Sequence, residues 1–171
     1  MSRSQAPSPD CRRQAGCARA DEVSAIAASV EDPELPGLTL GDLGIFRSAC
    51  VEADGSVGVE LTPTYSGCPA TEVIIDDVRT ALAKAGMTDV TVTMQLSPPW
   101  TTDWITAEGS QKLAAMGIAP PPRAGQVVFL VRCPQCGSRE TEMVSRFSGT
   151  ACKALHRCLA CLEPFEAVKA I

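Results

Sequence analysis

Two Cys-x-x-Cys motifs near the C-terminal end limit the folds open to this chain more than any other feature of its sequence. Cys133-Pro-Gln-Cys136 and Cys158-Leu-Ala-Cys161 are separated by 21 residues. Each motif forms a tight turn that aims two sulfurs at one point, and a hairpin brings the two turns to the same ion. The spacing therefore predicts a tetrahedral four-cysteine metal site within residues 126–171.

This C-terminal segment is expected to be a small β zinc ribbon. A segment of this length buries too little apolar surface to fold unaided, so bound metal supplies the missing stability. Zinc is the expected ion, although the spacing leaves iron or a cluster open, and a closed four-cysteine site is structural rather than catalytic. We expect Val127–Val131 to form a strand and the single histidine, His156, to lie half-exposed on the hairpin. Cys152 is interpreted as a packed side chain, with a spare ligand as the alternative.

The preceding region, residues 21–118, has the mixed periodicity of an α+β domain. Apolar residues recur at helical spacing over about 21–31, 74–85 and 102–116, and they alternate over 57–61 and 90–96; residues 45–51 are a further predicted strand. We therefore predict a small three-stranded sheet with about three helices, and a loop over 32–44. Residues 119–125 (APPPRAG) are predicted to be a proline-rich linker. Residues 1–20 show no periodicity and are expected to be a disordered tail.

Charge and hydropathy exclude several classes of partner. Residues 21–119 carry 15 Asp and Glu against 4 Lys and Arg, a net charge of −11, which would repel a nucleic-acid backbone. The chain has no apolar run near the roughly 18 residues of a membrane span, and no secretory signal is recognisable. Nine cysteines in such a chain favour metal binding in a reducing compartment over disulfides, so we expect a cytoplasmic protein.

A second motif, TPTYSGCPA over residues 62–70, places Cys68 directly before Pro69. Proline is favoured at the first position of a helix, so Cys68 is predicted to be the N-cap residue, where the helix dipole lowers the pKa of a thiol. Such a cysteine is a nucleophile or a metal ligand, or else a small buried side chain. Thr64 is a candidate hydrogen-bond donor. Asp32 and Glu34 are candidate ligands or acid–base groups, but Asp-Pro-Glu is also an ordinary end to a helix.

Three segments resemble the MIP-eighteen-like domain of iron–sulfur assembly proteins: DPELPGLTLGDLGI, LTPTYSGCPA and LSPPWTTDWI. Glu34, 29 intervening residues and Thr64-Tyr-Ser-Gly-Cys68-Pro69 follow that family's pattern of a glutamate, a spacer and Thr-x-x-Gly-Cys-Pro. The C-terminal segment from CPQCGS onward is similar to one subgroup, the PaaD (PaaJ) family of phenylacetate degradation. This resemblance implies that Cys68 handles a cluster and that Glu34 is its companion.

The resemblance also implies a function and partners. Members of this family accompany a multicomponent phenylacetyl-CoA epoxidase, which has a di-iron oxygenase and a reductase with a plant-type cluster. We therefore expect an accessory protein, not an enzyme, in which Cys68, Asp32, Glu34 and Thr64 transiently hold iron or an iron–sulfur cluster. Because one cysteine cannot satisfy a cluster, a homodimer or a shared small thiol is implied.

Two alternatives stay open at this point. One is a non-catalytic structural component of the epoxidase complex. The other is an enzyme that uses Cys68 as nucleophile, for which His156, in the other domain, is the one histidine available as a base. No role follows for Cys11, Cys17 or Cys50.

Overall fold

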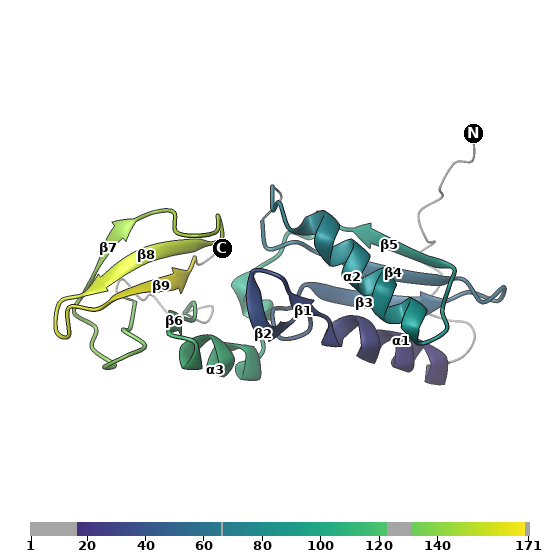
Figure 1. Ribbon diagram of the computed structural model, residues 1–171, viewed down its shortest axis with the longest axis horizontal. Helices are drawn as coiled ribbons and strands as arrows, with labels where there is room; N and C mark the ends of the chain where they lie inside the picture. The colour runs from purple at the N-terminus through teal and green to yellow at the C-terminus, as the bar shows by residue number, and fades with distance from the viewer. Residues whose placement is uncertain (1–16, 66, 123–130, 170–171) are drawn as a thin grey trace.

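The computed structural model describes residues 17–65, 67–122 and 131–169, which form two units arranged along one long axis (Figure 1). The first unit is a mixed sheet with helices, and the second is a ribbon of antiparallel strands. The α+β prediction with a C-terminal zinc ribbon is therefore confirmed. Among the described residues, no helix is long and apolar enough to cross a membrane.

The first unit is built on a three-stranded sheet in the order β3-β4-β5. Strand β3 (Phe46–Val51) runs antiparallel to β4 (Val57–Leu61), and β4 runs parallel to β5 (Val90–Met94). Helix α2 (Thr71–Lys84) makes the crossover between the two parallel strands. It buries Ile74, Val78 and Leu82, one stripe at helical spacing, against the sheet. Helix α1 (Cys17–Ser29) packs against α2 and β3 (Figure 1).

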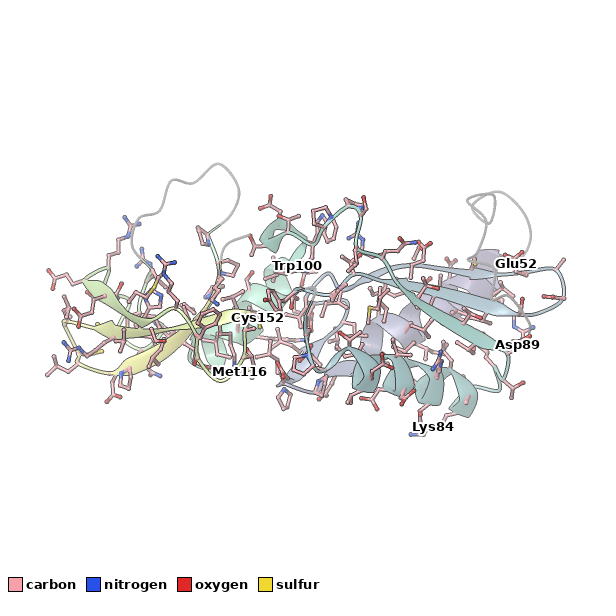
Figure 2. All side chains as sticks on the ribbon, turned by 90° about the horizontal axis from the view of Figure 1, so that it is seen from above. Glu52, Lys84, Asp89, Trp100, Met116 and Cys152 are labelled. Atoms are coloured by element: carbon pink, nitrogen blue, oxygen red, sulfur yellow. The ribbon has the colours of Figure 1, made fainter. Side chains whose placement is uncertain are left out.

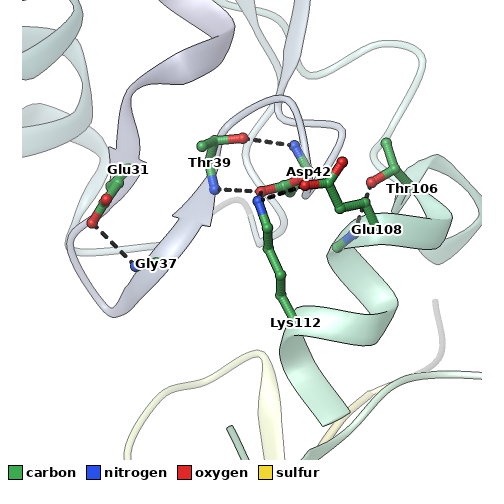
Figure 3. A network of polar contacts seen from close by, with 8 residues as sticks. Glu31, Gly37, Thr39, Asp42, Thr106, Glu108 and Lys112 are labelled. Carbon is green, nitrogen blue, oxygen red and sulfur yellow. Dashed lines mark hydrogen bonds and ion pairs between the residues drawn. The ribbon is translucent and has the colours of Figure 1, made fainter. Parts of the chain in front are cut away.

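A short hairpin and a third helix close the end of this unit that faces the ribbon. The hairpin consists of β1 (Glu31–Asp32) and β2 (Leu35–Thr39), and helix α3 (Ala107–Ala115) packs against β2. Figure 3 shows the polar contacts that join them. Asp42 exchanges hydrogen bonds with Thr39, and its Oδ2 forms a 2.8 Å ion pair with Lys112 of α3. This network fixes the loop that carries Leu43, one of the residues that line the pocket described below.

The second unit is a four-stranded sheet in the order β6-β9-β8-β7. Strands β7 (Thr141–Ser145), β8 (Lys153–Cys158) and β9 (Pro164–Val168) form an antiparallel meander. Strand β6 (Ile118–Ala119) follows α3 almost directly and pairs parallel with β9. The ribbon sheet therefore includes a strand, β6, that directly follows α3 of the first unit.

Several predicted boundaries are wrong in detail. The first helix begins at Cys17, within the segment expected to be a tail, and residues 1–16 lie outside the described residues. The predicted loop over 32–44 contains strand β2, and the predicted helix over 102–116 is a 3₁₀ turn, Thr102–Trp104, followed by α3. Thr106 caps α3 with its side chain and thereby separates the two.

The predicted linker needs one correction too, because its first residue, Ala119, pairs in β6. Residues 123–125 of that linker and most of the predicted strand Val127–Val131 lie outside the described residues. The domain boundary between residues 118 and 126 therefore stays a prediction.

Candidate functional site

A small cavity of about 30 Å³ opens where the two units meet. Four of its lining residues are the candidates from the first unit: Asp32, Glu34, Thr64 and Cys68. The ribbon contributes three more: Cys152, Val168 and Lys169. The volume has room for a single ion or water molecule. The structure thus brings the four candidate residues together, in a pocket that the ribbon completes.

Cys68 is held by the turn that leads into α2. Its N–H donates to the carbonyl of Tyr65 at 3.1 Å, and its own carbonyl accepts from both the N–H and the hydroxyl of Thr71. The N-cap of α2 is Ala70, not Cys68, so the predicted capping position is wrong by two residues. The half-buried thiol therefore lies two residues before the N-cap of the helix and is one of the groups that line the pocket.

The electrostatics of Cys68 are the reverse of the prediction. Burial raises the pKa of the Cys68 thiol above 9.0, and electrostatic interaction with Glu34, Asp32 and Cys152 raises it further. The N–H of Ala70 opposes these effects without overcoming them. Cys68 is thus a neutral thiol at pH 7 until a cation arrives to favour its thiolate.

Asp32 and Glu34 come from the β1–β2 hairpin. Asp32 is 8% exposed, and its Oδ1 accepts the N–H of Glu34 at 2.9 Å. Burial raises the pKa of Asp32, although its backbone donors and the charge of Lys153 oppose that effect. Lys153 belongs to the ribbon, so the charges of the two units act on each other at this pocket. Glu34 and Thr64 are half-buried beside it.

Sequence reasoning missed the ribbon's part in this pocket. Cys152, interpreted as a packed side chain, lies half-buried in the turn before β8 and lines the cavity that Cys68 also lines. Figure 2 shows Cys152 near the middle of the long molecule, between the two units. The available signal was a fifth cysteine in a unit whose metal site needs only four.

His156 also differs from its prediction. It lies on β8, is 6% exposed and stacks on Phe165 with ring centroids 5.6 Å apart. Burial lowers the pKa of His156. His156 is not one of the described residues that line the pocket containing Cys68. The geometry therefore gives no support to a Cys68–His156 catalytic pair.

The second candidate site is the four-cysteine centre of the ribbon. The sulfurs of Cys133, Cys136, Cys158 and Cys161 lie within 4.8 Å of one another. Two of the separations are 3.8 Å (Cys133 to Cys161) and 3.5 Å (Cys136 to Cys158). A tetrahedron with Zn–S bonds of about 2.3 Å has edges of about 3.8 Å. The donor set and its spacing therefore fit a structural zinc ion.

The two cysteine turns of this centre share one backbone design. Cys133 N–H donates to Ser138 and Cys158 N–H donates to Glu163, in each case the residue five positions later. Backbone N–H groups of Cys161 and Ala160 help to lower the pKa of Cys158 to about 6. The N–H of Glu163 favours the thiolate of Cys161, but burial and the neighbouring sulfurs raise its pKa to about 12. Four sulfurs this close need a cation to become thiolates together.

Comparison with known families divides the chain into the same two units as the structure does. Residues 20–96 match the family described as iron–sulfur cluster assembly protein, and residues 119–169 match the PaaD zinc beta ribbon domain. The crystal structure of a domain of unknown function, DUF59, from Bacillus anthracis aligns with a TM-score of 0.52 at 24% identity. The alignment covers 55% of this chain and 90% of that chain, and it shows the shared fold of the first unit.

Two curated relatives differ in how much of this chain they cover. A protein of Escherichia coli strain K12, provisionally named as a component of 1,2-phenylacetyl-CoA epoxidase, is 46% identical over 153 residues. That match spans 88% of this chain and 92% of the relative. The iron–sulfur protein maturation auxiliary factor SufT of Staphylococcus aureus strain USA300 is 40% identical over 78 residues, which span 45% of this chain and 88% of the relative.

Proposed function

This chain belongs to the PaaD family of 1,2-phenylacetyl-CoA epoxidase components, and from that premise we propose that it is an accessory protein that delivers iron or an iron–sulfur cluster to the epoxidase. Its relatives over the first unit are named as iron–sulfur maturation auxiliary factors. The clients in this proposal are the reductase, which needs a cluster, and the oxygenase, which needs a di-iron centre.

One observation carries this proposal, namely the pocket that gathers Cys68, Asp32 and Glu34. Thiolate and carboxylate are protein ligands of iron, and Thr64 adds a hydroxyl at the same place. Because the metal-free pocket disfavours the charge of Cys68 and Asp32, bound iron has a protonated competitor and can leave. Such a site suits a cargo that is passed on rather than a resident cofactor.

The zinc of the ribbon has a different part in this proposal. Zinc at the four-cysteine centre supplies folding energy and keeps the ribbon sheet in place. All four ligand positions are filled by cysteines, so no open position is available for a substrate. In this proposal the ribbon positions Cys152, Val168 and Lys169 in the pocket lining and presents a binding surface to the client.

A second candidate function is a non-catalytic structural component of the epoxidase complex. Exposed apolar side chains on the ribbon favour a docking role of this kind. Among the described residues of that unit, five of them are more than two-fifths exposed: Met143, Val144, Phe147, Leu159 and Leu162. Docking is compatible with delivery, so the two candidates differ in whether the client lacks metal without this chain.

The test is the iron content of the oxygenase and the reductase purified from cells that contain the chain, lack it, or carry Cys68→Ser. Delivery predicts iron-poor clients both without the chain and with Cys68→Ser. Cys50→Ser is the matched control, because Cys50 is a half-buried cysteine of β3 outside the described lining of the pocket. Fully metallated but inactive clients would contradict delivery and support the structural component.

A further inference from the structure

We propose that the ribbon supplies a second thiol ligand, so that a single ferrous ion is held between Cys68 of the first unit and Cys152 of the second. This inference rests on the proposed function, and it names both the cargo and the residue that completes its site. Its first support is position, because both cysteines line one cavity at the junction of the units.

Cys152 is held firmly by the ribbon sheet. Its carbonyl accepts the N–H of Lys169 at 3.0 Å, which extends the pairing of β8 with β9 by one more contact. Its Sγ lies 3.1 Å from the hydroxyl of Thr150. Strand β9 ends at Val168, which packs against the core of the first unit. A sulfur fixed in this way meets the pocket at a defined place rather than on a loose tail.

The charges around the cavity favour a cation. Two carboxyl groups, those of Asp32 and Glu34, line it beside the two thiols. The two nearby lysines have partners of their own. Lys153 Nζ lies 2.6 Å from Glu166, while Lys169 Nζ donates to the carbonyl of Ala151 at 2.6 Å and lies 4.0 Å from the ring centroid of Phe147.

Size and ligand type select a single ferrous ion. A cavity of about 30 Å³ admits one ion, whereas a four-iron cluster would require the two units to separate. Cys68 and Cys152 offer two soft sulfur donors, and the hard carboxyl groups of Asp32 and Glu34 line the same cavity, so both kinds of donor that suit Fe²⁺ are available there. On binding, each thiol forms an Fe–S bond as its S–H bond breaks and the proton passes to solvent. The iron stays ferrous, so the step needs no oxidant or reductant.

The experiment uses the full chain with zinc already in the ribbon, kept under anaerobic conditions. Co²⁺ is the optical probe, because its sulfur-to-metal absorption grows with the number of bound thiolates, and Fe²⁺ is then added in competition. We expect Cys152→Ser to halve the absorption per bound Co²⁺ and to weaken Fe²⁺ binding about tenfold or more. Cys50→Ser is expected to match the unchanged chain.

The outcomes separate this inference from the function on which it rests. If Cys68→Ser abolishes binding but Cys152→Ser leaves absorption and affinity unchanged, the two-unit site is wrong while iron handling by Cys68 stands. If neither substitution changes binding, the proposed function falls as well. Zinc content of one ion per chain and an unchanged circular dichroism spectrum show that each variant is folded, and Cys152→Ala gives a second variant.

A measurement on the unsubstituted chain tests the same geometry without relying on a variant. Phenylarsine oxide condenses with two adjacent thiols, forming two As–S bonds and releasing one water molecule. Peptide mapping of the zinc-loaded chain should find the Cys68 and Cys152 peptides joined by one phenylarsenic group, and added Fe²⁺ should slow the reaction. Separate modification of the two cysteines would overturn the inference.

Discussion

At the scale of single residues, Asp32 is a carboxyl whose surroundings disfavour its own charge. It is 8% exposed, its pKa is raised by burial, and the N–H of Glu34 satisfies one of its oxygens. Its protonated form is favoured in the folded state, so its ionisation destabilises the metal-free fold at any pH above both the folded and the unfolded pKa. A residue of this kind is typical of a binding site that is completed by its ligand.

We expect Asp32→Asn to stabilise the metal-free chain at pH 7, because the amide oxygen can still accept the N–H of Glu34 without a charge to bury. A gain of about 1 kcal/mol would raise the melting temperature by roughly 2–4 °C. Below the unfolded pKa, near 3.8, both forms are neutral and the difference should vanish. Thermal melts at pH 3 and pH 7 measure it.

Asp54→Asn is the matched control with the opposite sign. Hydrogen bonds from the N–H and hydroxyl of Ser56 lower the pKa of the exposed Asp54, so its charge favours the folded state above the unfolded pKa. That substitution should therefore lower the melting temperature at pH 7. An equal gain from both substitutions would mean that removing any acidic charge from this chain is enough, and that burial of Asp32 is not the cause.

The same residues show what the sequence could and could not predict about the site. Cys68 was recognisable from its own neighbours, because Gly67-Cys68-Pro69 before a helical pattern is a local signal. The direction of its pKa was not, because burial in the folded chain raises that pKa most, and residues 32, 34 and 152 add to the effect. Burial and neighbours that are brought together by folding decide that direction, and no local motif reports them.

At the scale of elements, the two cysteine turns of the ribbon differ at one equivalent position. Gly137 follows the first Cys-x-x-Cys motif with φ +75°, and Leu162 follows the second with φ +67°. A left-handed backbone suits glycine and is strained for a residue with a Cβ. The side chain of Leu162 is 69% exposed, so little packing offsets that strain.

We expect Leu162→Gly to stabilise the zinc-loaded chain by about 0.5–1 kcal/mol, since the relief of strain exceeds the added freedom of glycine in the unfolded chain. Gly137→Ala is the converse variant and should destabilise by about 1 kcal/mol. Denaturant midpoints compared at constant slope measure both. A less stable Leu162→Gly would show that contacts of this exposed side chain outweigh the strain of its backbone.

Elements with a clear period were predictable, and those held by distant contacts were not. Helix α2 and strand β4 carry their apolar residues at regular spacing, and both match the predicted spans closely. Strand β2 was missed because LPGLT has no alternation, and its pairing with β1 depends on the turn at Pro33 and Glu34. The helix over 102–116 was predicted too long because the cap at Thr106 lies within an otherwise helical pattern.

At the scale of the whole molecule, the two units have very different cores. Among the described residues, the core of the first unit contains 18 buried apolar residues, from Val23 to Ile118. In the described part of the ribbon the core contains five: Ala119, Cys133, Cys158, Phe165 and Ala167. Two of those five, Cys133 and Cys158, belong to the four-cysteine centre that fits zinc, so bound zinc would supply a large part of what holds the ribbon together.

We therefore expect removal of zinc from the full chain to unfold the ribbon and to leave the first unit folded. Apparent zinc-binding energies of about 10–16 kcal/mol exceed what so small a core can replace. Hydrogen exchange should accelerate over β7, β8 and β9, while amides of α2 and β3–β5 stay protected. The loss should also release Cys152 from the pocket, so a zinc-free chain should show the weaker Fe²⁺ binding of Cys152→Ser.

The junction between the units decides how far this unfolding spreads. Val168 packs on the core of the first unit, and β6, which directly follows α3, pairs with β9. Within the first unit, α3 is therefore the element that unfolding of the ribbon should affect most. Exchange at α3 should rise moderately, because the network of Asp42 and Lys112 still anchors that helix to the first unit (Figure 3). Loss of protection throughout β3–β5 would instead show one cooperative molecule, in which zinc stabilises the iron site through the whole fold rather than through Cys152 alone.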